Sequence, residues 1–320
     1  MDWVGQWYAL QEEVGEFARI RFGRVQDGCE PEWFTIPHQD ADGIGAFAQL
    51  LRTQGYGAFE TLPRARPRER DAGTSRRLVR LPMQVAAWKE FDHGWRGGSP
   101  EAACPSALAW RSLSVGQTQR LLRNAASHGA SFNSLALWAL HQAVAPSLVA
   151  DSGPSLWAMP VNLRGAVASA SEAANQFAVV DIELPQASSV APREVHARIK
   201  QLLAQGAHWQ AWDAWNIGER VGLDGMRMLF EKSLRAGRMK TGLYSNLGEW
   251  DDRRTTPAVD WVFLAPVSKG VPFAACLLTW RGRLTAAIQA HPALATDPSR
   301  AAGWLNAWLD TLLEAGDACA

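Results

Sequence analysis

A change in the spacing of apolar residues between positions 32 and 54 constrains the fold of this chain most strongly. The segment EWFTIP, residues 32–37, carries the aromatic and β-branched residues typical of a half-buried strand. After Gly43 the apolar residues recur at helical spacing, which predicts a helix over residues 43–54. His38 therefore lies where a predicted strand ends in a turn, and such a junction can aim a side chain into a cleft from a rigid element.

The remaining apolar patterns predict helices and strands that follow one another without a regular strand–helix–strand repeat. This order indicates an α+β fold with a mixed sheet. Ser114 is a candidate N-cap and Gly129 a candidate C-terminal cap. The predicted helices cover residues 5–20, 114–128, 130–149, 192–215 and a segment with Trp304 and Trp308, and the predicted strands cover 155–165, 175–185, 261–267, 272–282 and 283–292. Residues 17–25 either end the first helix or begin a strand that alternates Ile20, Phe22 and Val25.

The overall composition excludes several classes of protein. The chain has 320 residues and a formal net charge of zero, so no global field attracts nucleic acid or anionic lipid. The four cysteines are far apart and none forms a zinc-binding spacing, so we expect no metal site and a reducing compartment, the cytoplasm. Acidic residues in the first 16 positions argue against a secretory signal, and no apolar run is long enough to span a bilayer.

Two irregular segments interrupt the pattern between residues 62 and 107. Residues 91–107 are rich in Gly, Pro and small residues and are typical of a crossing between two lobes. Residues 62–82 form an extended connection that is locally basic, which fits either a solvated loop or a contact with an anion. The arginines of this connection are Arg64, Arg66, Arg68, Arg70, Arg76, Arg77 and Arg80.

Tryptophan is strongly over-represented, with 16 residues against 3 tyrosines. In the helix predicted over 192–215, Trp209, Trp212 and Trp215 are three residues apart and spread over one broad face. Large aromatic side chains in such number either fill a core or line a broad apolar channel.

Several segments, in their order along the chain, resemble the superfamily of chloramphenicol acetyltransferase, plant-type acyl-CoA-dependent acyltransferases, wax-ester-synthase-like enzymes and condensation domains of nonribosomal peptide synthetases. HQDADG is similar to the HxxxDG catalytic motif of that superfamily, and MPVNLRG to its strand ending in arginine. ANQFAVVDIELP resembles the segment that begins Gly-Asn, YSNLGEW the Ser-Asn-x-Gly loop, and PFAACLLTWRGRLTAAIQAHPALATD the closing hairpin. The resemblance extends over residues 30–315.

The resemblance implies a two-lobed α/β sandwich with mixed sheets and an active site at the interface of the lobes. We expect residues 1–105 to form the first lobe and residues 106–320 the second. Only 37 residues precede His38, so the first lobe is shortened. Pro37 stands where condensation domains carry a second histidine, which leaves one histidine, as in the plant-type enzymes. The plant-type Asp-Phe-Gly-Trp-Gly motif is absent.

In a protein of this kind His38 is the expected general base of acyl transfer, because imidazole titrates near neutral pH. The resemblance assigns Asp42 a structural role in which it pairs with Arg164. We expect Gly43 to let the chain leave the strand with dihedral angles that other residues avoid.

The same resemblance suggests further residues around the reacting atoms. Ser245 and Asn246 are candidate donors to the oxyanion of a tetrahedral intermediate, and Asn175 is a further candidate at the substrate. Trp209 and Trp212 are candidate walls of an acyl pocket. In the basic connection, Arg76, Arg77 and Arg80 are candidate contacts to the donor.

The sequence therefore favours an acyltransferase that moves an acyl group from a thioester to a hydroxyl or amine acceptor, in lipid or secondary metabolism. The donor is acyl-CoA or the phosphopantetheine arm of an acyl carrier protein, and no tightly bound cofactor is expected. A catalytically silent relative that acts as a binding or scaffold protein is the alternative, and a hydrolase that uses Ser245 is a third. The latter is disfavoured because YSNLG lacks the G-x-S-x-G elbow.

Overall fold

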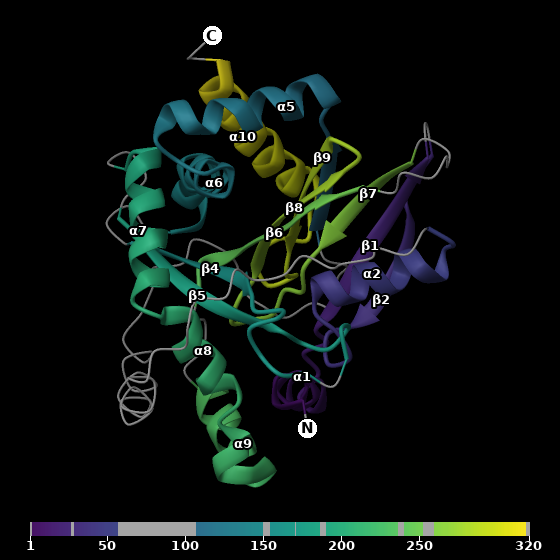
Figure 1. Ribbon diagram of the computed structural model, residues 1–320, viewed down its shortest axis with the longest axis vertical. Coiled ribbons are helices and arrows are strands. Elements are labelled where there is room, and N and C mark those ends of the chain that lie inside the picture. Colours follow the sequence, from purple (N-terminus) through teal and green to yellow (C-terminus); the bar gives the residue numbers. More distant parts are fainter. Residues whose placement is uncertain are drawn as a thin grey trace.

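The computed structural model describes residues 2–26, 29–56, 107–149, 154–169, 171–185, 190–235, 240–251 and 259–317. In this part of the chain the helices and strands form two sheets and the layers that cover them (Figure 1). The helices are α1 (Trp3–Glu13), α2 (Gly43–Thr53), α5 (Val115–Asn124), α6 (Phe132–Leu148), α7 (Pro192–Ala204), α8 (Ala207–Trp215), α9 (Gly218–Arg235) and α10 (Pro298–Asp317). The strands are β1 (Arg19–Gln26), β2 (Glu32–Pro37), β3 (Ala107–Ser112), β4 (Ser155–Asn162), β5 (Phe177–Leu184), β6 (Gly242–Trp250), β7 (Val259–Leu264), β8 (Phe273–Trp280) and β9 (Arg283–Ala290).

The larger sheet has six strands in the order β3-β9-β8-β6-β4-β5. Its β4–β6 and β6–β8 pairs are parallel and its other pairs antiparallel, so the sheet is mixed. α5, α6, α7 and α10 lie on one side of this sheet (Figure 1). Leu137 and Leu140 of α6 and Trp308 of α10 are fully buried against it in the largest apolar cluster of the described residues.

The smaller sheet is antiparallel and joins segments from both ends of the chain. Its order is β2-β1-β7, so the strand that ends at His38 pairs with β1, and β1 pairs with a strand of residues 259–264. Phe22, Phe47 and Trp261 pack in a second core between this sheet, α2 and the large sheet. The small sheet therefore crosses the boundary expected between residues 105 and 106.

Several local features follow the sequence closely. Ser114 caps α5 in a capping box with Gln117, and Gly129 ends the following 3-10 helix with a φ of 63°. The predicted hairpin between β8 and β9 turns at Arg281 and Gly282, whose φ values of 50° and 75° fit a type I′ turn. The α+β class with mixed strand directions is confirmed.

Other expectations about the elements were wrong. The first helix ends at residue 13 rather than 20, and residues 19–26 form β1, so of the two alternatives for residues 17–25 the strand is present. The helix predicted over 192–215 is two helices, since Gly206 adopts a left-handed φ of 74° between them. The structure also adds β3 and α9, and it turns the predicted Ser-Asn-x-Gly loop into strand β6.

Candidate active site

His38 directly follows β2 and is held there by the backbone. Its N–H donates to the carbonyl of Ala18, 3.0 Å away. This bond continues the antiparallel β1–β2 pairing, in which Arg19 lies opposite Pro37. The side chain is 7% exposed. Within the described residues, Nδ1 is enclosed without a hydrogen-bond partner. The strand end therefore presents the imidazole inside the protein, as the sequence pattern predicts.

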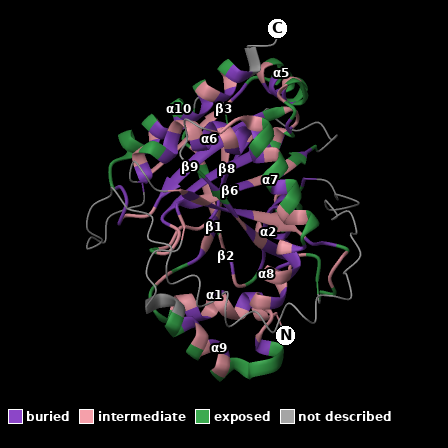
Figure 2. Cartoon of the chain, turned by 90° about the vertical axis from the view of Figure 1, so that its left-hand side faces the viewer, coloured by how far each residue is buried: buried purple, intermediate pink, exposed green. Residues whose placement is uncertain are grey.

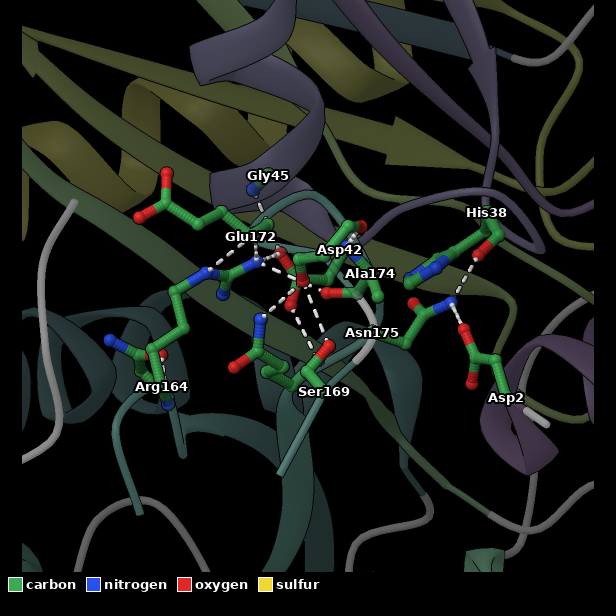
Figure 3. Close-up of polar contacts among 12 residues, drawn as sticks. Asp2, His38, Asp42, Gly45, Arg164, Ser169, Glu172, Ala174 and Asn175 are labelled. Carbon is green, nitrogen blue, oxygen red and sulfur yellow. Dashed lines mark hydrogen bonds and ion pairs between the residues drawn. The ribbon is translucent and has the colours of Figure 1, made fainter. Parts of the chain in front are cut away.

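Asp42 joins three segments through its two carboxylate oxygens (Figure 3). Oδ1 accepts from the N–H of Gly45 at 2.9 Å, which caps α2, and from Arg164 Nη2 at 2.6 Å. Oδ2 accepts from the N–H of Gln176 at 2.9 Å. The expected Asp42–Arg164 pair is therefore present, and neither oxygen of Asp42 is hydrogen-bonded to the His38 ring.

Arg164 in turn fixes the segment that follows β4. Its guanidinium donates to the carbonyl oxygens of Glu172 and Ala174 as well as to Asp42. These bonds shape the chain that leads to Asn175, so one buried cation links the HxxxDG turn to the start of β5.

Two glycines allow α2 to approach its neighbours closely. Gly43 does not adopt a positive φ, so the expectation of unusual dihedral angles was wrong. A Cβ at Gly43 would lie 2.8 Å from Leu247 Cδ2, and one at Gly45 would lie 2.3 Å from the carbonyl oxygen of Ala173. The motif glycine is needed for space beside β6.

Asn175 is buried beside the backbone of His38. Its Nδ2 donates to the His38 carbonyl at 3.1 Å and to Asp2 Oδ2 at 3.1 Å (Figure 3). Asp2 caps α1 through its other oxygen, which accepts from Gly5 N–H at 2.9 Å. The amide therefore connects the first helix to the HxxxDG turn.

Aromatic side chains surround the His38 ring. Tyr8 of α1 stacks on the imidazole with 3.9 Å between ring centroids and 13° between planes. Phe177 of β5 lies 5.4 Å from the imidazole, and Trp215 of α8 packs edge-on against both Tyr8 and Phe177. In Figure 2, α1 lies below β1 and β2, next to α9. The imidazole thus lies in an apolar environment.

This environment determines the charge state of His38. Burial lowers the pKa of His38 below its ordinary value of 6.5, while its own backbone carbonyl and the Asp42 carboxylate partly oppose that shift. The ring is therefore neutral near pH 7. A neutral imidazole has a free lone pair on one nitrogen, which is what a general base requires.

The two oxyanion candidates lie on opposite faces of β6. Ser245 is buried, is in register with Cys276, and by strand alternation shares a face with Leu247, which contacts Gly43. Asn246 points to the other face, where its Nδ2 donates to Asn133 Oδ1 at 2.6 Å. Ser245 is therefore the candidate on the HxxxDG side.

The tryptophans of α8 differ in their surroundings. Trp209 is buried in an apolar cluster with Leu163 and Ala178. Trp212 is half-buried and packs against this cluster and against the cluster that contains Phe177. Trp215 lies nearest to the rings around His38. Arg76, Arg77 and Arg80 lie outside the described residues.

Sequence reasoning missed Asp2, Tyr8 and Phe177, which contact His38 or its immediate partner. The only signal in the sequence was an Asp one residue before the start of a helix with aromatic residues on several faces. Among the described residues there is no group of three or more metal-ligating side chains. No helix in the described ranges has the length and apolar character needed to cross a membrane.

Comparisons with known proteins give a match at the level of structure. No protein-family model and no curated protein sequence matches the chain. Trichothecene 15-O-acetyltransferase from Fusarium sporotrichioides superposes with a TM-score of 0.62 at 15% identity, over 92% of this chain and 70% of that one. Polyketide synthase associated protein 5 from Mycobacterium tuberculosis superposes with a TM-score of 0.57 at 16% identity, over 92% of this chain and 76% of that one.

The condensation domain of the monacolin K polyketide synthase MokA also matches, with a TM-score of 0.54 at 10% identity over 93% of this chain and 72% of that one. At these identities the likeness shows a common fold. The chain therefore has the fold of chloramphenicol acetyltransferase-like and condensation-domain acyltransferases, as the order of its motifs predicted.

Proposed function

We propose that this protein is an acyltransferase in which His38 is the general base. It moves an acyl group from a thioester, either acyl-CoA or an acylated carrier protein, to a hydroxyl or amine acceptor. The observation that carries the proposal is the neutral, buried imidazole at the end of β2, beside the Asp42–Arg164 pair. The fold shared with acyltransferases supports the same reaction class.

The reaction follows from the state of the imidazole. His38 removes the proton of the acceptor as its oxygen or nitrogen attacks the thioester carbonyl, which forms a tetrahedral intermediate with a negative oxygen. Ser245 is the proposed donor to that oxygen, supported by its place on the same face of β6 as Leu247, the neighbour of Gly43. When the intermediate collapses, the carbon–sulfur bond breaks and the leaving thiolate receives the proton from the imidazolium.

A thiol-release assay tests this function. The full chain is incubated with acyl-CoA or acyl-pantetheine donors of different lengths and a panel of small alcohols and amines, and mass spectrometry detects the acylated acceptor. We expect His38→Ala to lower the rate by about 10²–10⁴-fold. His128→Gln is the control, because a glutamine amide can still donate to the carbonyl of Ala315 as His128 does. Equal rates in His38→Ala and the parent would disprove the role of His38.

A catalytically silent binding protein is the second candidate, and one observation favours it. Tyr8 covers the His38 ring and leaves the residue only 7% exposed. A silent protein would bind the thioester donor in calorimetry and release no thiol above the rate of His38→Ala. Turnover that depends on His38 excludes this candidate.

A further inference from the structure

A charged pair lies further along the strand that carries Phe177. Asp181 of β5 forms an ion pair with Lys240 through Oδ2, and the N–H of Lys240 donates to the Gly270 carbonyl at 3.1 Å. Although 30% of the Asp181 side chain is exposed, its Oδ1 is buried and has no hydrogen-bond partner within the described residues. Buried acceptors without a donor are rare in folded proteins, so this oxygen is a candidate contact for a ligand.

Asp181 and His38 lie on the same side of the large sheet. Phe177 contacts the His38 ring, with 5.4 Å between the ring centroids. The pairing of β4 with β5 runs without a shift in register, so Phe177, Val179 and Asp181 point to one face by strand alternation. The four residues from Phe177 to Asp181 span about 13 Å of strand. The ion pair therefore lies about this length of strand away from the ring that contacts His38.

Apolar side chains lie between these two places. Val179 is half-buried and, together with Trp212 and Trp215 of α8, packs against the cluster that contains Phe177. α8 itself packs against β5 (Figure 1). An acyl chain that extends from the proposed base along β5 therefore meets apolar side chains first and the Asp181 carboxylate at its far end.

The charges of the pair select the kind of group that fits at this end. A carboxylate oxygen only accepts hydrogen bonds, so Asp181 Oδ1 requires an O–H or N–H donor. A carboxylate on the ligand is repelled by Asp181, and an ammonium group is repelled by the neighbouring Lys240. A neutral hydroxyl group avoids both costs and supplies the donor.

We propose that Asp181, held by Lys240, is a specificity-determining residue that binds a hydroxyl group at the far end of the donor's acyl chain. This inference rests on the proposed function and names its substrate class, a hydroxylated medium-chain acyl thioester. An extended chain advances about 3.5 Å for every three bonds, so about ten bonds lead from the thioester carbonyl to Asp181. A decanoyl chain with a hydroxyl group on its last carbon has this length.

Binding to a variant without the base separates recognition from catalysis. His38→Ala protein is titrated by calorimetry with decanoyl-pantetheine and with ω-hydroxydecanoyl-pantetheine, since pantetheine is common to both types of donor. We expect the hydroxylated chain to bind about tenfold more tightly, as for one hydrogen bond to a charged group. A terminal hydroxyl on hexanoyl-pantetheine should add nothing, because it does not reach Asp181. Equal affinities of the two decanoyl ligands, or no binding of either, would overturn the proposal.

Substitutions in the same His38→Ala background test the residues. Asp181→Ala should remove the tenfold preference and leave the affinity for decanoyl-pantetheine unchanged. Glu183→Ala is the matched control, because Glu183 is an exposed carboxylate and the next residue on the same face of β5. Lys240→Gln should strengthen the binding of a decanoyl chain that ends in an ammonium group, since the repelling charge is gone. A preference for the hydroxyl that survives in Asp181→Ala would contradict the contact.

Turnover gives a second readout in the protein that retains His38. In the thiol-release assay, kcat/KM should be about tenfold higher for the ω-hydroxydecanoyl donor than for the decanoyl donor, and Asp181→Ala should equalise the two values. Turnover without this preference would overturn the inference and leave the proposed function intact. Binding that depends on Asp181, in a protein that releases no thiol, would refute the proposed function and leave the inference standing.

Discussion

Arg164 and Asp42 form an ion pair with 2.6 Å between Nη2 and Oδ1, although 122 residues separate them in sequence. Their side chains are only 4% and 5% exposed. A buried pair of this kind is weak evidence for net stabilisation, because both charges lose their hydration. Removing one partner is a different matter, since the other charge then stays buried alone.

We therefore expect Asp42→Asn to lower the free energy of unfolding by about 3–5 kcal/mol. The change leaves the Arg164 guanidinium without its counter-charge and weakens the cap of α2. Denaturant unfolding at pH 7 measures the effect. Asp40→Asn, at an exposed position two residues away, is the control. A stable Asp42→Asn protein that is nevertheless inactive would show that Asp42 takes part in catalysis directly.

Gly45→Ala tests the close contact between α2 and the chain that carries Asn175. The new methyl group would lie 2.3 Å from the Ala173 carbonyl oxygen, so one of the two segments has to move. We expect a loss of about 1–3 kcal/mol in unfolding free energy, together with a loss of acyl transfer. Gly116→Ala in α5 is the control, because nothing lies within 4 Å of its new Cβ. Equal stability of the two variants would contradict the contact.

His141 should make the protein acid-sensitive. Burial lowers the pKa of His141 from 6.5 to about 4, and its ring bonds to the Pro185 carbonyl and to Trp157 Nε1. A group whose pKa is lowered on folding contributes stability that is complete above the unfolded pKa and is lost as the pH falls. We expect a loss of about 3 kcal/mol between pH 6.5 and 4.

His141→Gln checks this assignment. A glutamine amide does not titrate and can still donate to the Pro185 carbonyl. The variant should therefore show a smaller dependence of unfolding free energy on pH between 6.5 and 4. The same slope in variant and parent would assign the acid sensitivity to other groups.

The aromatic residues near His38 predict a preference for medium or long acyl donors over acetyl. Each methylene of an acyl chain that is buried gains about 0.8 kcal/mol. Trp212→Ala should reduce kcat/KM for long-chain donors and leave acetyl transfer unchanged. Trp304→Ala, in the core where α10 packs on Phe273 of β8, is the control. A strong preference of the parent for acetyl donors would leave the tryptophans with a packing role only.

The basic connection of residues 62–82 carries a prediction about the donor. Replacing Arg76, Arg77 and Arg80 by Ala should raise the donor KM and weaken its dependence on salt, since arginines form paired hydrogen bonds to phosphates and carboxylates. The acceptor KM should stay unchanged. Kinetics at low and moderate salt measure both values. Identical donor KM values for variant and parent at both salts would identify a solvated loop.

The sequence predicted the parts of the site that depend on local pattern. His38 follows a strand and Asp42 begins a helix because the apolar period changes from two to about 3.6 between them. The Asp42–Arg164 pair came from the resemblance, since 122 residues separate its members. No local rule predicts that Tyr8 stacks on His38, because that contact depends on how α1 packs against α8 and β2.

Glycines and asparagines account for the elements that were missed. Asn246 and Gly248 indicate a turn, yet they lie in β6, where Gly248 has a φ of 81° and the register with β8 shifts. Gly222 and Gly225 interrupt the helical pattern of α9, and Gly222 departs from helical dihedral angles within it. Tertiary packing overrides the local preference in both elements.

The pairing of β1 with β7 also determines when the site can form during synthesis. β1 and β2 leave the ribosome well before β7, which lies at residues 259–264, so β1 has to wait for the chain between them before its second edge is paired. A two-stranded hairpin is at best marginally stable in water, and an unpaired edge can associate with other chains. The strand that precedes His38 is therefore synthesised long before the sheet that holds it is complete, and a ribosome-bound chain truncated before residue 259 should lack the site.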